Sequence, residues 1–141
     1  MKSKYFLDSC VFIRSFDKES PEKMKKSKDL IKTTLKSNKG IISYHVIQEF
    51  LIEAMHKFKN PIKAVDCKVY VSNFLFPICE IFPTIDLVKN AIDIIVETEL
   101  DFNNAIKLAA AVQGNAKVYY TEVLGNLYEI KGLKVVNPFM E

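Results

Sequence analysis

The chain has 141 residues, of which 49% are hydrophobic and 26% are charged, and its formal net charge is +3. This length predicts one domain over residues 1–141, with enough apolar residues for a core, and the mild positive charge permits an anionic partner without requiring one. No apolar stretch approaches the length of a membrane span, and no signal peptide is visible. The three cysteines lack CxxC spacing, which is typical of reduced thiols. We therefore expect a cytoplasmic protein that does not contact a membrane.

Lys4 to Leu7 is an apolar run that predicts a short buried strand. Asp8 ends this run and precedes a predicted helix, so its carboxylate lies at the C-terminal end of the strand, where ligands bind in open α/β sheets. Ser20-Pro21-Glu22 predicts the start of a helix that continues to about Ser37. Gly40, which follows this helix, is suited to the left-handed conformation that often ends a helix.

The next segment predicts a second strand and two more helices. Ile41 and Ile42 form the strand, and Ser43 caps a helix whose apolar residues recur every three or four positions. Asn60-Pro61 ends that helix. A further helix covers roughly residues 61–74, and its inward-facing residues are expected to be Ala64, Val65, Val69 and Tyr70.

The second half of the chain continues the alternation of strands and helices. Strands are predicted at residues 78–82, 118–120 and 134–136, and helices are predicted over residues 85–98 and after Asp101, which caps a helix rich in small residues. The alternation predicts an α/β fold, in which a central parallel sheet of about five strands carries helices on both faces.

Oxygen-bearing side chains are expected near the carboxyl ends of these strands or on the helices that follow: Asp8, Glu49, Asn104, Thr121 and Glu122. Carboxylates that converge from separate elements repel one another, so they persist together around a cation. Oxygen ligands suit Mg²⁺ or Mn²⁺, which can activate water and neutralise a phosphodiester transition state. The spacing alone equally allows Asp8 to be a helix N-cap and Glu49 to be a solvated helix residue.

Four segments resemble the signatures of the PIN domain family and occur in the family's order. They are Tyr5-Phe6-Leu7-Asp8-Ser9, Ile42-Ser43-Tyr44-His45-Val46-Ile47-Gln48-Glu49, Asp101-Phe102-Asn103-Asn104-Ala105-Ile106 and Tyr120-Thr121-Glu122-Val123-Leu124. The closing Val136-Asn137-Pro138-Phe139 is similar to that of VapC-like members, the toxins of type II toxin–antitoxin pairs.

This resemblance implies a PIN-like three-layer fold and a metal-dependent endoribonuclease that hydrolyses RNA phosphodiesters with a metal-activated water. It implies Mg²⁺ or Mn²⁺ as the cofactor, with Asp8, Glu49 and Asn104 as catalytic and metal-binding residues and Glu122 as a further metal ligand. It also implies RNA as the substrate, a cognate antitoxin protein as a partner, and a homodimer.

The sequence departs from the family pattern at two positions. Asn104 and Val123 stand where the family usually has aspartates, so Asp8 and Glu49 are the acids retained. An amide oxygen can still bind Mg²⁺, whereas valine offers no ligand and has Glu122 as its acidic neighbour. Two lost negative charges predict weaker metal binding. The loss of these two acids also leaves a second hypothesis open, in which the chain is a catalytically weak or inactive module that binds an antitoxin or RNA.

Other charged and polar residues have both a functional and a structural interpretation. Eight lysines between Lys18 and Lys39 form either a track for RNA phosphates or a solvated helix face. Arg14 is the best single candidate for a phosphate contact. Ser9 and Thr121 either serve the substrate and the metal site or act as capping groups.

A third class of function, a receiver-like regulator with Asp8 as the phosphoryl acceptor, fits the sequence less well. Receiver domains carry extra acids beside the first strand, and the segment from Lys2 to Asp8 has no such pair.

Overall fold

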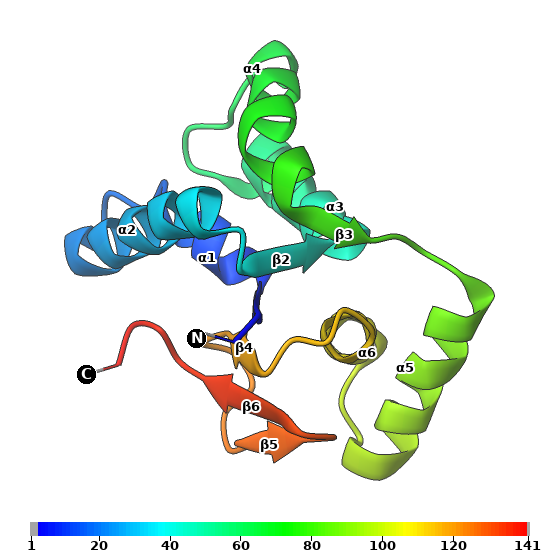
Figure 1. Cartoon of the computed structure of the whole chain (residues 1–141). Helices are drawn as coiled ribbons and strands as arrows, with labels where there is room; N and C mark the ends of the chain where they lie inside the picture. The colour runs from blue at the N-terminus through cyan, green and yellow to red at the C-terminus, as the bar shows by residue number, and fades with distance from the viewer. Residues whose placement is uncertain (1–2, 141) are drawn as a thin grey trace.

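The structure is a computed structural model that describes residues 3–140. Its centre is a six-stranded sheet with the order β3-β2-β1-β4-β6-β5 (Figure 1). The strands are β1 (Tyr5–Leu7), β2 (Gly40–Ser43), β3 (Cys79–Ile81), β4 (Val118–Tyr120), β5 (Glu129–Ile130) and β6 (Leu133–Val136). Neighbouring strands pair in parallel except β5 and β6, so the predicted parallel sheet is confirmed and gains an antiparallel hairpin at one edge.

Helices connect the strands and flank the sheet. They are α1 (Ser9–Arg14), α2 (Pro21–Ser37), α3 (Tyr44–Ile52), α4 (Ala64–Tyr70), α5 (Ile85–Thr98) and α6 (Phe102–Gln113), with the π-helical turns η1 (Glu53–Lys57) and η2 (Val71–Leu75) and the 3-10 turn η3 (Phe76–Ile78). Figure 1 shows α2 on one side of the sheet and α5 with α6 on the other, while α3 and α4 extend beyond β2 and β3. None of these helices is both long and apolar enough to cross a membrane.

Side-chain caps explain where α5 and α6 begin. The Thr84 hydroxyl accepts a hydrogen bond from the Leu87 N–H at 3.1 Å. The Asp101 carboxylate accepts one from the Asn104 N–H at 3.0 Å. These contacts satisfy N–H groups that have no partner inside the helix, and they confirm both predicted starts.

The end of α2 differs from the prediction. Asn38, with a φ of 58°, takes the left-handed conformation, whereas Gly40 is the first residue of β2. Gly40 is required there for space, because a Cβ atom would lie 2.3 Å from the Cγ2 atom of Thr34 and 2.8 Å from the ring of Tyr5. The glycine therefore allows the end of α2 to pack closely against the sheet.

The helix α4 is oriented differently from the prediction. The expectation that Ala64, Val65 and Val69 face inward is wrong, because all three are exposed. The contacts with the core come instead from Cys67, which is buried, and from Tyr70 one turn later.

The two central strands determine where the polar residues after them lie. The register pairs Leu7 of β1 with Tyr120 of β4, so Asp8 and Thr121 follow side by side. The backbone N–H of Asp8 donates to the Tyr120 carbonyl at 3.0 Å, which continues the pairing for one more residue. The carboxyl ends of β1 and β4 are thus held in a fixed relation by the sheet.

Candidate functional site

Asp8 is buried at the carboxyl end of β1. It is the N-cap of α1, since its backbone is extended and its Oδ1 accepts a hydrogen bond from the Ser9 N–H at 2.7 Å. Thr121, which follows β4, donates its hydroxyl to Asp8 Oδ2 at 2.7 Å. Asp8 therefore caps a helix and also forms the centre of a buried polar cluster.

Glu49 reaches this cluster from α3. The helix buries Val46 and Phe50, and Glu49 lies at the border of that buried face with its side chain 35% exposed. The Ser9 hydroxyl donates to Glu49 Oε1 and so connects the two acids. Asp8, Ser9, Glu49 and Thr121, which come from three separate parts of the sequence, are thus brought together by the fold.

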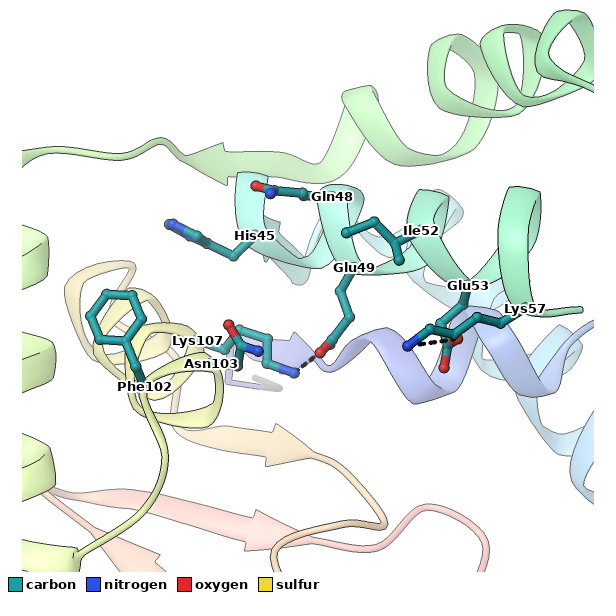
Figure 2. Close-up of a pocket in the computed structure, with 9 residues that line it drawn as sticks. All are labelled: His45, Gln48, Glu49, Ile52, Glu53, Lys57, Phe102, Asn103 and Lys107. Atoms are coloured by element: carbon teal, nitrogen blue, oxygen red, sulfur yellow. Dashed lines mark hydrogen bonds and ion pairs between the residues drawn. The ribbon is translucent and has the colours of Figure 1, made fainter.

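The remaining member of the cluster is Lys107 of α6, which is 3% exposed. Its Nζ atom lies 2.6 Å from Asp8 Oδ1 and 2.6 Å from Glu49 Oε1. Figure 2 shows the Glu49 side chain extending from α3 to meet it. Burial lowers the pKa of Lys107, but the charges and hydrogen bonds of Asp8 and Glu49 raise it by more, so the net shift is upward. The cluster holds a charged ammonium between two carboxylates.

Lys107 was not among the residues that the sequence motifs indicated, although one signal points to it. It interrupts the apolar run Ala105-Ile106-Lys107-Leu108-Ala109, whose other members are all buried. A lysine within such a run is expected to be buried, and a buried charge requires a partner. It also lies one helical turn after Asn104, on the same side of α6.

The other two positions where the family pattern has acids contribute little to the cluster. Asn104 is partly buried in the first turn of α6. In the described part of the chain, no hydrogen bond joins its side chain to Asp8 or Glu49. Val123 is exposed in the loop after β4.

Glu122 faces a second cluster of charges. Its Oε2 accepts a hydrogen bond from Arg14 Nε at 2.7 Å, its Oε1 accepts one from Lys23 Nζ at 2.9 Å, and Arg14 also pairs with Asp17. Burial raises the pKa of Glu122, but Arg14 and Lys23 outweigh that effect and the net shift is downward. The predicted phosphate contact, Arg14, and the predicted metal ligand, Glu122, thus bind each other.

The side chains of the acidic cluster do not fit a divalent cation in this arrangement. Mg²⁺ and Mn²⁺ need several free oxygen ligands, whereas the facing oxygens of Asp8 and Glu49 are both bound to the Lys107 ammonium. Within residues 3–140, no three His, Cys, Asp or Glu side chains are arranged to hold a metal ion. An ammonium about 4 Å from a divalent cation would oppose it by roughly 8 kcal/mol at an effective dielectric of about 20.

A pocket of about 360 Å³ opens beside the cluster. Glu49 and Lys107 form its inner wall, and Lys57, Asn103 and Phe102 lie around it (Figure 2). The pocket therefore combines donors that suit an anion with an exposed aromatic ring and two carboxylates, Glu49 and Glu53, of which Glu53 pairs with Lys57.

A second pocket is an apolar groove of about 390 Å³ on the side of α2. Its walls include the apolar and aromatic side chains of Phe16, Met24, Ile31, Leu35, Tyr70 and Phe74. Lys18, Lys28 and Lys32, which are exposed, border it. We refer to this surface as the α2 groove.

The comparisons with known proteins agree with the predicted resemblance. A search of solved structures found a toxin–antitoxin complex from Klebsiella pneumoniae, with a TM-score of 0.69 and 18% identity over 96% of this chain and 98% of that chain. It also found the DNA-bound VapBC complex of Salmonella typhimurium, with a TM-score of 0.63 and 16% identity over 97% of this chain and 99% of that chain. A third is the sarcin–ricin loop cleaving toxin VapC20 of Mycobacterium tuberculosis, with a TM-score of 0.56 and 17% identity over 86% of this chain and 92% of that chain.

A search of curated proteins found no match. The family model described as "PIN domain" matches residues 5–122 and therefore contains Asp8, Glu49 and Lys107. Because this match extends over most of the sequence, and the fold agrees with it, the chain belongs to the PIN domain family.

Proposed function

We propose that this chain is a toxin-type PIN protein that binds an antitoxin-class protein, and that it does not hydrolyse RNA through a resident divalent cation. The observation that carries the proposal is the α2 groove, an apolar surface with partly exposed aromatic rings and a border of lysines. In the acidic cluster, by comparison, the facing oxygens of Asp8 and Glu49 are already bound to the Lys107 ammonium. The toxin–antitoxin complexes among the solved structures of similar fold support a partner of this class.

The α2 groove indicates the chemistry of that partner. Phe16 and Phe74 leave much of their rings exposed to water, and covering apolar surface contributes about 25 cal/mol per Å². The bordering lysines Lys18, Lys28 and Lys32 favour acidic residues beside the apolar contact. We expect an amphipathic segment whose apolar face enters the groove and whose acidic residues meet the lysines.

Complex formation with a candidate antitoxin tests the proposal; the candidate is a small protein from a reading frame next to the gene for this chain. Phe74→Asp should weaken the complex by at least about 10-fold in calorimetry, because it places a charge in the apolar contact. The double variant Lys28→Glu with Lys32→Glu should slow association, and the effect should shrink as salt is added. Lys89→Glu, an exposed site on α5, is the matched control and should leave the affinity unchanged.

Two results would contradict the proposal. One is the absence of any complex with that protein. The other is a complex whose affinity is the same for wild type, Phe74→Asp and the double lysine variant, because the partner would then bind elsewhere.

The pocket beside Glu49 favours a second candidate function, the RNA hydrolysis that the family resemblance implies. Lys57 and Asn103 offer donors for a phosphate, and Phe102 offers a ring on which a base can stack. Nucleases of this family generally use Mg²⁺. For this chain to do so, Asp8, Glu49 and Asn104 would have to exchange the Lys107 ammonium for the metal.

Cleavage of a defined RNA in Mg²⁺ or Mn²⁺ separates the two functions. We expect no cleavage by the wild type. Cleavage by the wild type that is lost in Asp8→Asn would establish the nuclease and contradict the metal part of the first proposal. The double variant Asn104→Asp with Val123→Asp restores the usual acids. Its RNA cleavage, compared with that of wild type, measures how much activity the two substitutions remove.

A further inference from the structure

Lys107 is the one lysine that the structure records as buried among the described residues. It belongs to the central turns of α6, whose residues from Ala105 to Ala111 are all buried. The neighbouring helices α3 and α5 and the strand β2 pack against α6. Its ammonium therefore has little room to move away from the atoms it now contacts.

Lys107 supplies the one positive charge of the cluster, which offsets one of the two negative charges of Asp8 and Glu49. One ammonium lies 2.6 Å from an oxygen of each of two carboxylates, Asp8 and Glu49. Ser9 and Thr121 supply the remaining hydrogen bonds to those carboxylates. A buried charge is tolerated when it is paired and hydrogen-bonded in this way. Without Lys107, two acids would face each other with no cation between them.

We propose that Lys107 takes the place of the divalent cation at this PIN-type centre: its ammonium holds Asp8 and Glu49 together and keeps a divalent cation out. The inference concerns the metal selectivity of the acidic cluster. It does not depend on whether the α2 groove binds a partner.

Asn104 and Val123, which replace the usual aspartates of the family, are consistent with a site that holds the singly charged Lys107 ammonium in place of a divalent cation. With four acids, one ammonium would leave three negative charges in excess, whereas with Asp8 and Glu49 alone it leaves one. Asn104 lies one turn from Lys107 on α6, so an aspartate there would add a third carboxylate near the ammonium. The chain thus combines fewer acids with a cation of its own.

Lys107→Met tests the proposal, because methionine has a similar length but no charge. Thermal denaturation in EDTA should show that the variant melts about 5 °C or more below wild type, since two acids are left without a cation. Added Mn²⁺ should then raise the melting temperature of the variant by about 5 °C, and that of wild type by less than about 1 °C. Calorimetry with Mn²⁺ should show binding to the variant alone.

Two control variants sharpen this test. Lys117→Met removes an exposed lysine and should respond to Mn²⁺ as wild type does. Asp8→Asn combined with Lys107→Met should lose the Mn²⁺ response, because one of the two retained acids is gone. A merely structural role for Lys107 would lower stability without creating a response to Mn²⁺.

Three results would overturn the proposal. Wild type could bind Mn²⁺ as tightly as Lys107→Met, the folded variant could bind no Mn²⁺, or the double variant could respond as strongly as the single one. If Lys107→Met folds only when Mn²⁺ is present, the proposal is supported. If it folds in neither condition, Lys107→Gln is measured in the same way, and the absence of an Mn²⁺ response in that folded variant overturns the proposal.

Discussion

Two charge clusters lie beside the carboxyl ends of β1 and β4, and they differ chiefly in burial. In the acidic cluster, the side chains of Lys107 and Asp8 are 4% and 1% exposed. In the neighbouring cluster, Arg14 and Lys23 are 30% and 38% exposed where they bind Glu122. The bonds have similar lengths in both. Water and salt therefore screen the Arg14 and Lys23 ends of the second cluster more than the Lys107–Asp8 pair, although Glu122 itself is 11% exposed and Glu49 is 35% exposed. Burial rather than distance decides how much each pair contributes.

The largest expected effect breaks the buried cluster. Lys107→Met leaves two buried acids without a cation and should lower the free energy of unfolding by about 3–5 kcal/mol. Urea unfolding at neutral pH measures it, and the dependence on urea should stay close to that of wild type. A loss below about 1 kcal/mol would place Lys107 in the same class as the exposed pairs.

A double-mutant cycle measures the coupling inside the buried cluster. Asp8→Asn and Lys107→Met together should cost less than the sum of the two single changes, with a coupling of about 0.5–3 kcal/mol, because each single change leaves the other charge unpaired. Urea unfolding of the four proteins gives this value. Additive costs would mean that the 2.6 Å contact contributes no coupling.

The exposed cluster should respond weakly. Glu122→Gln removes the charge that Arg14 and Lys23 share and should cost about 1 kcal/mol or less. Urea unfolding at low and high salt should show that the difference from wild type shrinks as salt is added. A cost that is large and independent of salt would show that this cluster is shielded from water.

The smallest expected effect is a dependence of stability on pH. The pKa of Glu122 is lowered from its ordinary value of 4.5 in the folded protein, because Arg14 and Lys23 outweigh burial. The stability that this adds is fully present above the ordinary value and is lost as the pH falls through the lowered one. In Arg14→Met, the free energy of unfolding should therefore fall less steeply than in wild type as the pH decreases below about 4.5. A variant that follows the wild-type pH curve there would contradict this assignment.

Most of the fold could be predicted from the sequence because its signals are local. The cap Asp101 indicates the start of one helix, and alternation of strands and helices indicates the parallel sheet. The inward face of α4 could not be derived in this way. Val65 and Val69 are apolar but exposed, and only the packing of the neighbouring elements determines that Cys67 is the buried residue. The strand β5 could not be predicted either, because its two residues are too few to show the alternation of apolar and polar residues that indicates a strand.

The candidate site was predicted in part. Asp8 and Glu49 follow from the resemblance, and the structure brings them to one ammonium. Lys107 could not be assigned to them from the sequence, because its partners lie 58 and 99 positions away and are chosen by the packing of α6. Glu122 lies next to Val123, the position where the family has an acid. Its partners Arg14 and Lys23 could not be assigned from the sequence, because they lie on α1 and α2, far from Glu122 along the chain.

The two edges of the sheet have a consequence for how the protein behaves at high concentration. The edge strands β3 and β5 span three and two residues. An edge strand exposes unpaired backbone groups on which another chain can add a strand, and aggregation begins where that row is long and flat. Such short edges offer few of these groups, so we expect the folded protein to resist strand-to-strand association between copies.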